Sequence, residues 1–249
     1  MVGTAAVARA TPDGYTLLMA TASLPASKAL VKNLEVDAER DLAPISQIGI
    51  VPTAISVSSE LPVSNMLEFI AYAKSRPGKL NYGTVGPSNT LSIEMFNGLA
   101  GINLVRIPYK GDAPTAIALS RNEVQLAFLA PLTAKTLVQN GKARILAVSS
   151  ATIRSRVIPE VPAAAEAGLK GFDQSAWYGV LAPANTPKNL RDKVAKDISA
   201  FVAQPTVQER LGQQGIEPVG NSPDEFARLI ADQSAKFVLA ARKAGIEPE

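Results

Sequence analysis

Small and hydroxyl-bearing residues gather in one segment of the chain, residues 76–96, which reads RPGKLNYGTVGPSNTLSIEMF. We expect a short strand over 79–82, then a loop, then a helix that begins near Ser88. The start of a helix presents backbone N–H groups at its positive end, and such a site suits an anion. The candidate ligand-binding residues of this loop are Thr84, Gly86, Ser88, Asn89 and Thr90.

The same pattern also fits a purely structural role. Ser, Thr and Asn favour helix caps whatever the function, so the loop could simply join a strand to a capped helix. In the binding hypothesis, N–H and O–H groups donate charge-assisted hydrogen bonds to a carboxylate. Gly83 and Gly86 would let the backbone approach the ligand closely, because glycine has no Cβ.

The composition argues against catalysis. The chain contains no His and no Cys, so the commonest proton shuttle, the thiol nucleophile and the soft metal ligands are absent. Asp112 and Glu166 could be interpreted as an acid/base pair, yet no nucleophile, metal-binding set or stacking aromatic residue accompanies them. We therefore expect a binding protein, with no catalytic residue, no metal and no cofactor.

Two further loops follow predicted strands. Thr21 and Ser23 come after an apolar run and could present hydroxyl groups to a ligand, although a cap or turn explains them equally well. Ala130 and Pro131 follow a predicted strand over 124–129. Ligands of open α/β sheets gather beyond the carboxyl ends of strands, so this loop could supply backbone contacts.

Trp177 and Tyr178 complete the candidate ligand-binding residues. They lie near a predicted crossing between two lobes. A lone Trp is more often part of a core than of a ligand-binding wall, so packing is the alternative role.

In the central part of the chain, strands and helices alternate with short connections, which predicts an α/β protein with a parallel sheet there. Ser64 and Ser222 are the expected N-caps of two of the helices. Expected strands cover 15–20, 42–57 (as one strand or two in line), 79–82, 104–108, 124–129, 144–149, 177–182 and 217–219, and expected helices cover 3–10, 25–34, 63–75, the segment from about 88, 114–120, 132–140, 190–203, 207–214 and 223–244.

The long apolar strands around Pro62 and Pro183 suggest that the chain leaves one lobe and later returns to it. We predict a first lobe from residues 1–57 and 181–249, a second lobe from 58–180, and a hinge of two crossing strands. A cleft between such lobes is a common place for a ligand.

Charge and hydropathy limit the possible partners. The net charge is +3, and the basic residues are spread along the chain without stacking aromatics, so nucleic acid is not an expected partner. No apolar run approaches the ~20 residues that span a bilayer. The first residues, MVGTAAVARATPDG, lack the basic and apolar regions of a signal peptide.

Seven segments, taken in order, resemble one family. They are PDGYTLLMAT, DLAPISQIG, RPGKLNYGTVGPSNT, IPYKG, NGKARILAVSS, EVPAAAEAGLKGF and WYGVLAPANTP. Together they are similar to the substrate-binding proteins of tripartite tricarboxylate transporters, the Bug family. The resemblance implies a two-lobed fold like that of type II periplasmic binding proteins, a periplasmic location, a small carboxylate or related solute as ligand, and transporter membrane subunits as partners.

The sequence departs from the family's pattern in three ways. The family usually carries a signal peptide, a first strand and a Gly-rich loop ahead of the residue matching Gly3, so we expect a misplaced start or a truncated gene. A frequent His is replaced in the region of Leu91 and Ser92, and a usual acidic residue is Gln125. Two alternatives to the receptor follow: a truncated remnant that does not bind, or a cytoplasmic effector-sensing domain, which would need an appended DNA-binding segment.

Overall fold

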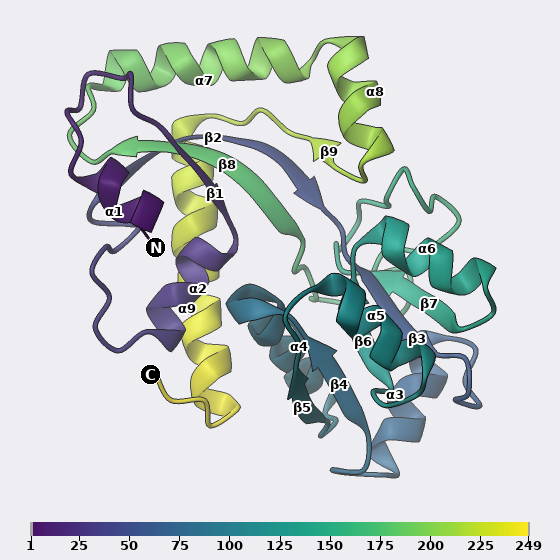
Figure 1. Ribbon diagram of the computed structural model, residues 1–249. Coiled ribbons are helices and arrows are strands. Elements are labelled where there is room, and N and C mark those ends of the chain that lie inside the picture. The colour runs from purple at the N-terminus through teal and green to yellow at the C-terminus, as the bar shows by residue number, and fades with distance from the viewer. Residues whose placement is uncertain (1, 249) are drawn as a thin grey trace. The chain divides into compact units, whose positions relative to one another are not determined.

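The chain passes back and forth between two structural units. In the computed structural model, which describes residues 2–248, unit 1 comprises residues 2–50, 176–211 and 217–248, and unit 2 comprises residues 51–175 and 212–216 (Figure 1). The lobes predicted from the sequence change over after residues 57 and 180, a few residues later than the units do.

Unit 1 is built on a sheet in the order β1-β8-β2-β9. β1 (Leu18–Thr21) is antiparallel to β8 (Ala176–Pro183), and β9 (Glu217–Pro218) is antiparallel to β2 (Leu42–Val51). In the first of these pairs, Thr21 lies directly opposite Tyr178. Two candidate residues far apart in the sequence are therefore neighbours on this sheet.

Helices cover both faces of this sheet. Successive side chains of β8 point to opposite faces, and each face belongs to its own apolar cluster. Trp177 and Leu181 pack with residues of α9 (Pro223–Lys243), whereas Val180 and Ala182 pack with residues of α7 (Lys188–Val202). Unit 1 also contains α1 (Val2–Ala8), α2 (Ser23–Leu30), which contacts α9, and most of α8 (Pro205–Gln213), whose last two residues belong to unit 2.

Unit 2 is built on a sheet in the order β5-β4-β6-β3-β7. β4 is parallel to β5 and β6, and β3 is antiparallel to both β6 and β7. The four strands β4 to β7 therefore run in one direction, as predicted for this part of the chain, and only β3 runs against them, so the sheet is mixed. β3 enters unit 2 directly, without a preceding helix of that unit, so no βα crossover sets its direction. The strands are β3 (Ala54–Ser58), β4 (Asn81–Thr84), β5 (Val105–Pro108), β6 (Leu126–Leu129) and β7 (Ala143–Val148).

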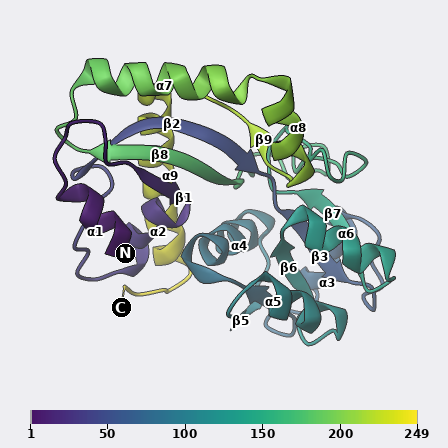
Figure 2. The same cartoon turned by 45° about the horizontal axis from the view of Figure 1, so that its top comes forward.

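Two helical layers enclose the unit 2 sheet. On one face, Phe69 of α3 (Met66–Lys74) and Phe96 of α4 (Gly86–Ala100) pack with Phe128 of β6. On the other face, Leu119 and Ala134 pack with Ala127 and Leu129 of β6. Leu119 belongs to α5 (Asp112–Ser120) and Ala134 to α6 (Pro131–Gln139), and these two helices lie side by side (Figures 1 and 2).

One predicted strand needs a new start, and a second prediction, which left one strand or two open, is resolved. The first strand begins at Leu18 and not at residue 15, because the backbone N–H of Tyr15 donates to Asp13 Oδ1 in a turn and the Tyr15 side chain is 93% exposed. The run 42–57, predicted as one strand or as two, forms two strands, β2 and β3, with a break at Pro52 and Thr53.

The two predicted helix caps have different outcomes. Ser222 is the N-cap of α9 and forms a capping box with Glu225, as expected. The N-cap of α3 is Asn65 and not Ser64: the Asn65 side chain accepts from the N–H of Glu68, while Ser64 donates its own N–H to the Glu68 carboxylate. The N-cap of α3 therefore lies one residue later than predicted.

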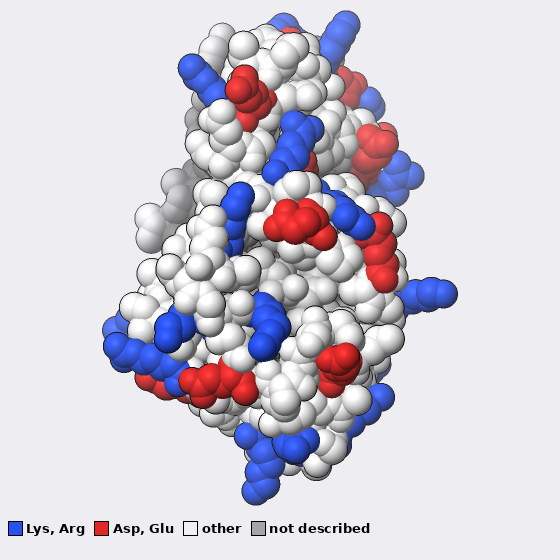
Figure 3. Space-filling model, turned by 90° about the vertical axis from the view of Figure 1, so that its right-hand side faces the viewer, with Lys and Arg blue, Asp and Glu red and all other residues white. Residues whose placement is uncertain are grey.

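The surface carries charges of both signs. On the face shown in Figure 3, Lys and Arg are interspersed with Asp and Glu. A nucleic-acid-binding face would instead gather basic residues into a stripe or patch. Among the helices of residues 2–248, none has the length and apolar character required to cross a membrane.

Candidate functional site

Three strand ends meet at one edge of the unit 2 sheet. β4 is parallel to both β5 and β6, so the carboxyl ends of these strands lie at the same edge. The backbone N–H of Tyr109 donates to the carbonyl oxygen of Thr84 at 2.9 Å, which joins the ends of β4 and β5. The helices α4, α5 and α6 begin just beyond these strand ends. In open α/β sheets, this is the edge at which ligands bind.

Hydroxyl and amide side chains fold the loop between β4 and α4. The buried Thr84 Oγ1 donates to Asn89 Oδ1 at 2.9 Å and lies 2.9 Å from Thr90 Oγ1. Thr90 Oγ1 in turn lies 2.9 Å from the carbonyl oxygen of Gly86, to which it can donate. These side chains hold one another, so in this state their role is to shape the loop.

The Asn89 amide connects this loop to β6. Its Oδ1 also accepts the backbone N–H of Val85 at 3.2 Å, and its Nδ2 donates to the carbonyl oxygen of Phe128 at 3.0 Å. One half-buried side chain therefore fixes both the entry of α4 and the distance between two strand ends.

The turn at Gly86 is the open part of the loop. Gly86 is exposed and has a φ of +65°, and a Cβ placed on it would meet nothing within 4 Å. The N-cap residue Val85 offers no side-chain hydrogen bond, and the first turn of α4 holds no acidic residue. The half-buried Ser88 lies in the same turn. A positive helix end that faces open space without a resident carboxylate is well suited to an anion.

The loop after β6 is a poorer source of donors than expected. Ala130 donates its backbone N–H to Asp112 Oδ1 at 3.3 Å, and its carbonyl oxygen accepts the N–H of Ala134 at 3.0 Å. Pro131 is buried and has no N–H. The backbone groups predicted to contact a ligand here are thus committed to the protein itself.

The candidates of unit 1 form a second, separate group. Thr21 is exposed at the end of β1, and its Oγ1 accepts the backbone N–H of Ser23 at 3.4 Å. Ser23 is half-buried and begins α2. Tyr178, paired with Thr21 across the sheet, is 40% exposed. The sheet therefore pairs Thr21 with Tyr178, and the turn after β1 brings the backbone of Ser23 to Thr21.

Trp177 has the packing role that the sequence left open. It is only 1% exposed and contacts the Phe226 ring edge to face at 5.1 Å. Its Nε1 donates to Gln233 Oε1 at 2.7 Å. Because its ring and its one donor are used within unit 1, Trp177 is a core residue.

The two acidic residues considered as an acid/base pair serve different structural ends. Glu166 accepts from Arg154 Nε at 2.9 Å and from the N–H of Ala163, and the Arg154 hydrogen bond lowers the pKa of this carboxyl below its ordinary value. Asp112 Oδ2 is buried without a hydrogen-bond partner among the described residues, a situation that costs roughly 1–3 kcal/mol. No group of acidic side chains in the described part of the chain is arranged to hold a metal ion.

Gln125, which departs from the family's acidic pattern, has a structural role. Its Oε1 accepts the backbone N–H of Asn81 at 2.8 Å, and its Nε2 donates to the carbonyl oxygen of Asn122 at 2.7 Å. An amide can make both bonds, whereas a carboxylate would lack the second donor. The Gln125 amide therefore connects Asn81, at the start of β4, to the turn at Asn122.

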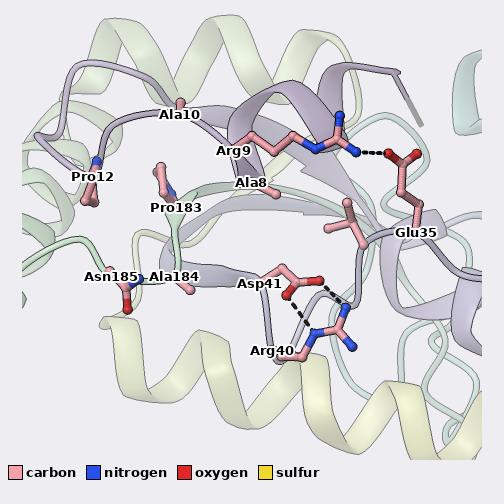
Figure 4. A pocket seen from close by; sticks show the side chains of 11 residues that line it. Ala8, Arg9, Ala10, Pro12, Glu35, Arg40, Asp41, Pro183, Ala184 and Asn185 are labelled. Carbon is pink, nitrogen blue, oxygen red and sulfur yellow. Dashed lines mark hydrogen bonds and ion pairs between the residues drawn. The ribbon is translucent and has the colours of Figure 1, made fainter.

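A cavity of about 420 Å³ lies within unit 1, where the sequence predicted no site (Figure 4). Its charged side chains are paired with one another: Arg9 with Glu35, and Arg40 with Asp41 at 2.7 Å. The pairing leaves no net charge to attract an ionic ligand. The cavity is lined by Ala8, Arg9, Ala10, Pro12, Glu35, Val36, Arg40, Asp41, Pro183, Ala184 and Asn185.

Two α/β units with an anion-compatible turn at a sheet edge define the class: a two-lobed fold like that of the periplasmic binding proteins. Solved structures support this. The chain is 32% identical to an R. palustris protein solved with adipate, covering 100% of this chain and 84% of the other with a TM-score of 0.82. It is 32% identical to the periplasmic binding protein BugD over the same shares, with a TM-score of 0.78. It is 26% identical to MatC from Rhodopseudomonas palustris with bound malate, covering 96% and 83%, with a TM-score of 0.76.

The family follows from the sequence comparison. Residues 1–245 match the tripartite tricarboxylate transporter family receptor, TctC, and the chain belongs to this family. The family consists of substrate-binding receptors and not of enzymes, which confirms the prediction of a binding protein. The resemblance to Bug proteins inferred from the seven segments is confirmed as well.

Proposed function

We propose that this protein is a periplasmic solute receptor that binds a small carboxylate and delivers it to the membrane subunits of a tripartite tricarboxylate transporter. Units 1 and 2 would be its two lobes. The ligand carboxylate would bind at the Gly86 turn, where it accepts hydrogen bonds from the first turn of α4 and from Ser88. Thr84, Asn89 and Thr90 would hold the turn in shape. Thr21, Ser23 and Tyr178 would be the ligand-facing group of unit 1.

One observation carries the proposal: the open Gly86 turn at the start of α4. The helix is fifteen residues long, has no acid in its first turn and begins with an exposed glycine above which there is free space. Relatives solved with adipate and with malate bind acids of the class that suits such a turn.

Isothermal titration calorimetry against a panel of small mono- and dicarboxylates tests the proposal. Ser88→Asp places a fixed carboxylate in the first turn of α4, where it competes with the ligand for the same positive field. We expect affinity to fall by at least about tenfold, which corresponds to roughly 1.4 kcal/mol.

Two controls separate this effect from a general change in charge. Ser88→Asn keeps a polar side chain that can donate a hydrogen bond but carries no charge, and it should lose much less affinity than Ser88→Asp. Asn189→Asp adds the same charge to the first turn of α7, which also lacks an acidic residue, and should leave affinity unchanged. A Ser88→Asp variant that binds its ligand normally would contradict the site, and a protein that binds no carboxylate of the panel would contradict the function.

A further inference from the structure

The proposed carboxylate site has an acidic side chain at its border. Asp112 is the first residue of α5, just beyond the end of β5, and it is half-buried. Its Oδ1 accepts the backbone N–H of Ala130 at 3.3 Å, which ties it to the end of β6. Asp112 is therefore anchored at the same sheet edge as the α4 turn.

The separation between this carboxylate and the α4 turn follows from β6. Asn89 is bound to the carbonyl oxygen of Phe128, and Asp112 is bound to the N–H of Ala130. Only residue 129 lies between these two backbone groups, which places them about 5 Å apart along extended chain. A small organic acid of four to six carbons spans a similar length, so a ligand held at one point reaches the other.

The two points have opposite chemistry. The α4 turn offers donors and a positive helix end, whereas Asp112 offers a negative charge and an acceptor, Oδ2, that has no donor among the described residues. Lys110 is exposed two residues earlier, and none of the ion pairs in the described residues joins it to Asp112. The Asp112 carboxylate thus forms no ion pair with Lys110 among the described residues.

We infer that Asp112 is a specificity-determining residue, which favours carboxylates that carry a second, hydrogen-bond-donating group over dicarboxylates. This inference rests on the proposed function. The ligand's carboxylate binds at the α4 turn, and its ammonium or hydroxyl group donates to the Asp112 carboxylate. Oδ2 has no exposed surface in this state, so contact requires a rotation of the half-buried side chain toward the ligand.

Selectivity arises because the second group of a dicarboxylate would meet a like charge. An ammonium group in that place gains a charge-assisted hydrogen bond, and a hydroxyl gains a weaker one. A site with a buried acceptor discriminates strongly against ligands that leave it unpaired.

Calorimetric titration of the full chain with ligand pairs of equal length tests the inference. Suitable pairs are 6-aminohexanoate with adipate and 4-aminobutyrate with succinate. In the natural protein, the member that carries the ammonium group should bind at least about tenfold more tightly than its dicarboxylate partner. Asp112→Asn keeps an oxygen for the Ala130 N–H but removes the charge, and it should reduce that ratio by about tenfold or more.

Glu166→Gln is the matched control, since it removes one negative charge elsewhere in unit 2 and should leave the ratio unchanged. Tighter binding of the dicarboxylates by the natural protein would overturn the inference and leave the receptor function intact. The same holds if a folded Asp112→Asn variant keeps the natural ratio. Because the first measurement needs no variant, the inference stays testable even if Asp112→Asn does not fold. Binding of no member of any pair would overturn the receptor function together with the inference.

Discussion

Trp177 and Gln233 form a buried hydrogen bond that joins β8 to α9. The indole Nε1 donates to the amide Oε1 at 2.7 Å, and both side chains are almost fully buried. The bond fixes the Trp177 ring against Phe226, at the centre of the apolar cluster of unit 1. A strand and a helix separated by tens of residues in the sequence are thus aligned by one polar contact.

Replacing Gln233 by Leu should destabilise unit 1, because the buried indole N–H would lose its acceptor. We expect the free energy of unfolding to fall by about 1–3 kcal/mol, measured by urea denaturation followed by far-UV circular dichroism, because Trp177 is the only Trp of the chain and a fluorescence signal would be lost in the double variant. In the double variant Trp177→Phe with Gln233→Leu, no donor is left unpaired. The two substitutions together should therefore cost less than the sum of the single ones, and simple additivity would argue against the role of this bond.

Asn89→Ala should loosen the turn of the proposed site. The substitution removes the hydrogen bonds to Thr84, Val85 and Phe128 while it leaves the start of α4 without new charge. We expect a stability loss of about 1–3 kcal/mol and weaker carboxylate binding, measured on the same sample by thermal unfolding with and without ligand. Loss of stability with unchanged affinity would mean that the turn keeps its shape without the Asn89 amide.

The sequence predicts the elements of the site better than its bonds. Gly86 and the hydroxyl residues after it mark a strand–loop–helix unit through local preference, and the Ser222–Glu225 spacing identifies the start of α9 in the same way. The partner of Ala130 is Asp112, eighteen residues earlier, and nothing local to either residue specifies that contact. The Ala130 N–H, which the sequence suggested as a donor to a ligand, therefore already donates to Asp112.

The direction of β3 was also beyond local prediction. The apolar character of β3 fits a buried strand, yet its antiparallel pairing with β6 and β7 depends on where the chain enters unit 2. The same limit applies to Trp177, whose neighbours Phe226 and Gln233 become visible only once α9 is placed on the sheet. Which side of a sheet a residue faces follows from pairing, and pairing is a long-range property.

Acid should weaken the start of α9. The Glu225 carboxylate accepts from the Ser222 hydroxyl and from the Ser222 N–H, and these bonds lower the pKa of Glu225 below its ordinary value of 4.5. Since the folded pKa is the lower one, the contribution to stability is present above the unfolded pKa and is lost as pH falls through the folded value.

Urea unfolding midpoints measured between about pH 7 and pH 3 check this. The Glu225→Gln variant should show a smaller loss of stability over the acid range than the natural protein. Glu160→Gln, a neutralised exposed carboxylate outside any helix, should follow the natural pH profile. Equal profiles for the natural protein and Glu225→Gln would show that the capping box does not contribute to acid sensitivity.

Gly179 should tolerate no side chain, because a Cβ at this position on β8 would overlap the ring of Phe226. Phe226 is fully buried between the sheet and α9, so the ring has no free space to move into. Gly179→Ala should therefore lower the free energy of unfolding by about 1–3 kcal/mol through overpacking, seen as a lower thermal midpoint. The double variant Gly179→Ala with Phe226→Leu replaces the ring by a smaller side chain and should be more stable than the two separate costs imply. If the double variant instead loses the full sum, the Gly179–Phe226 contact is not what requires a glycine at this position.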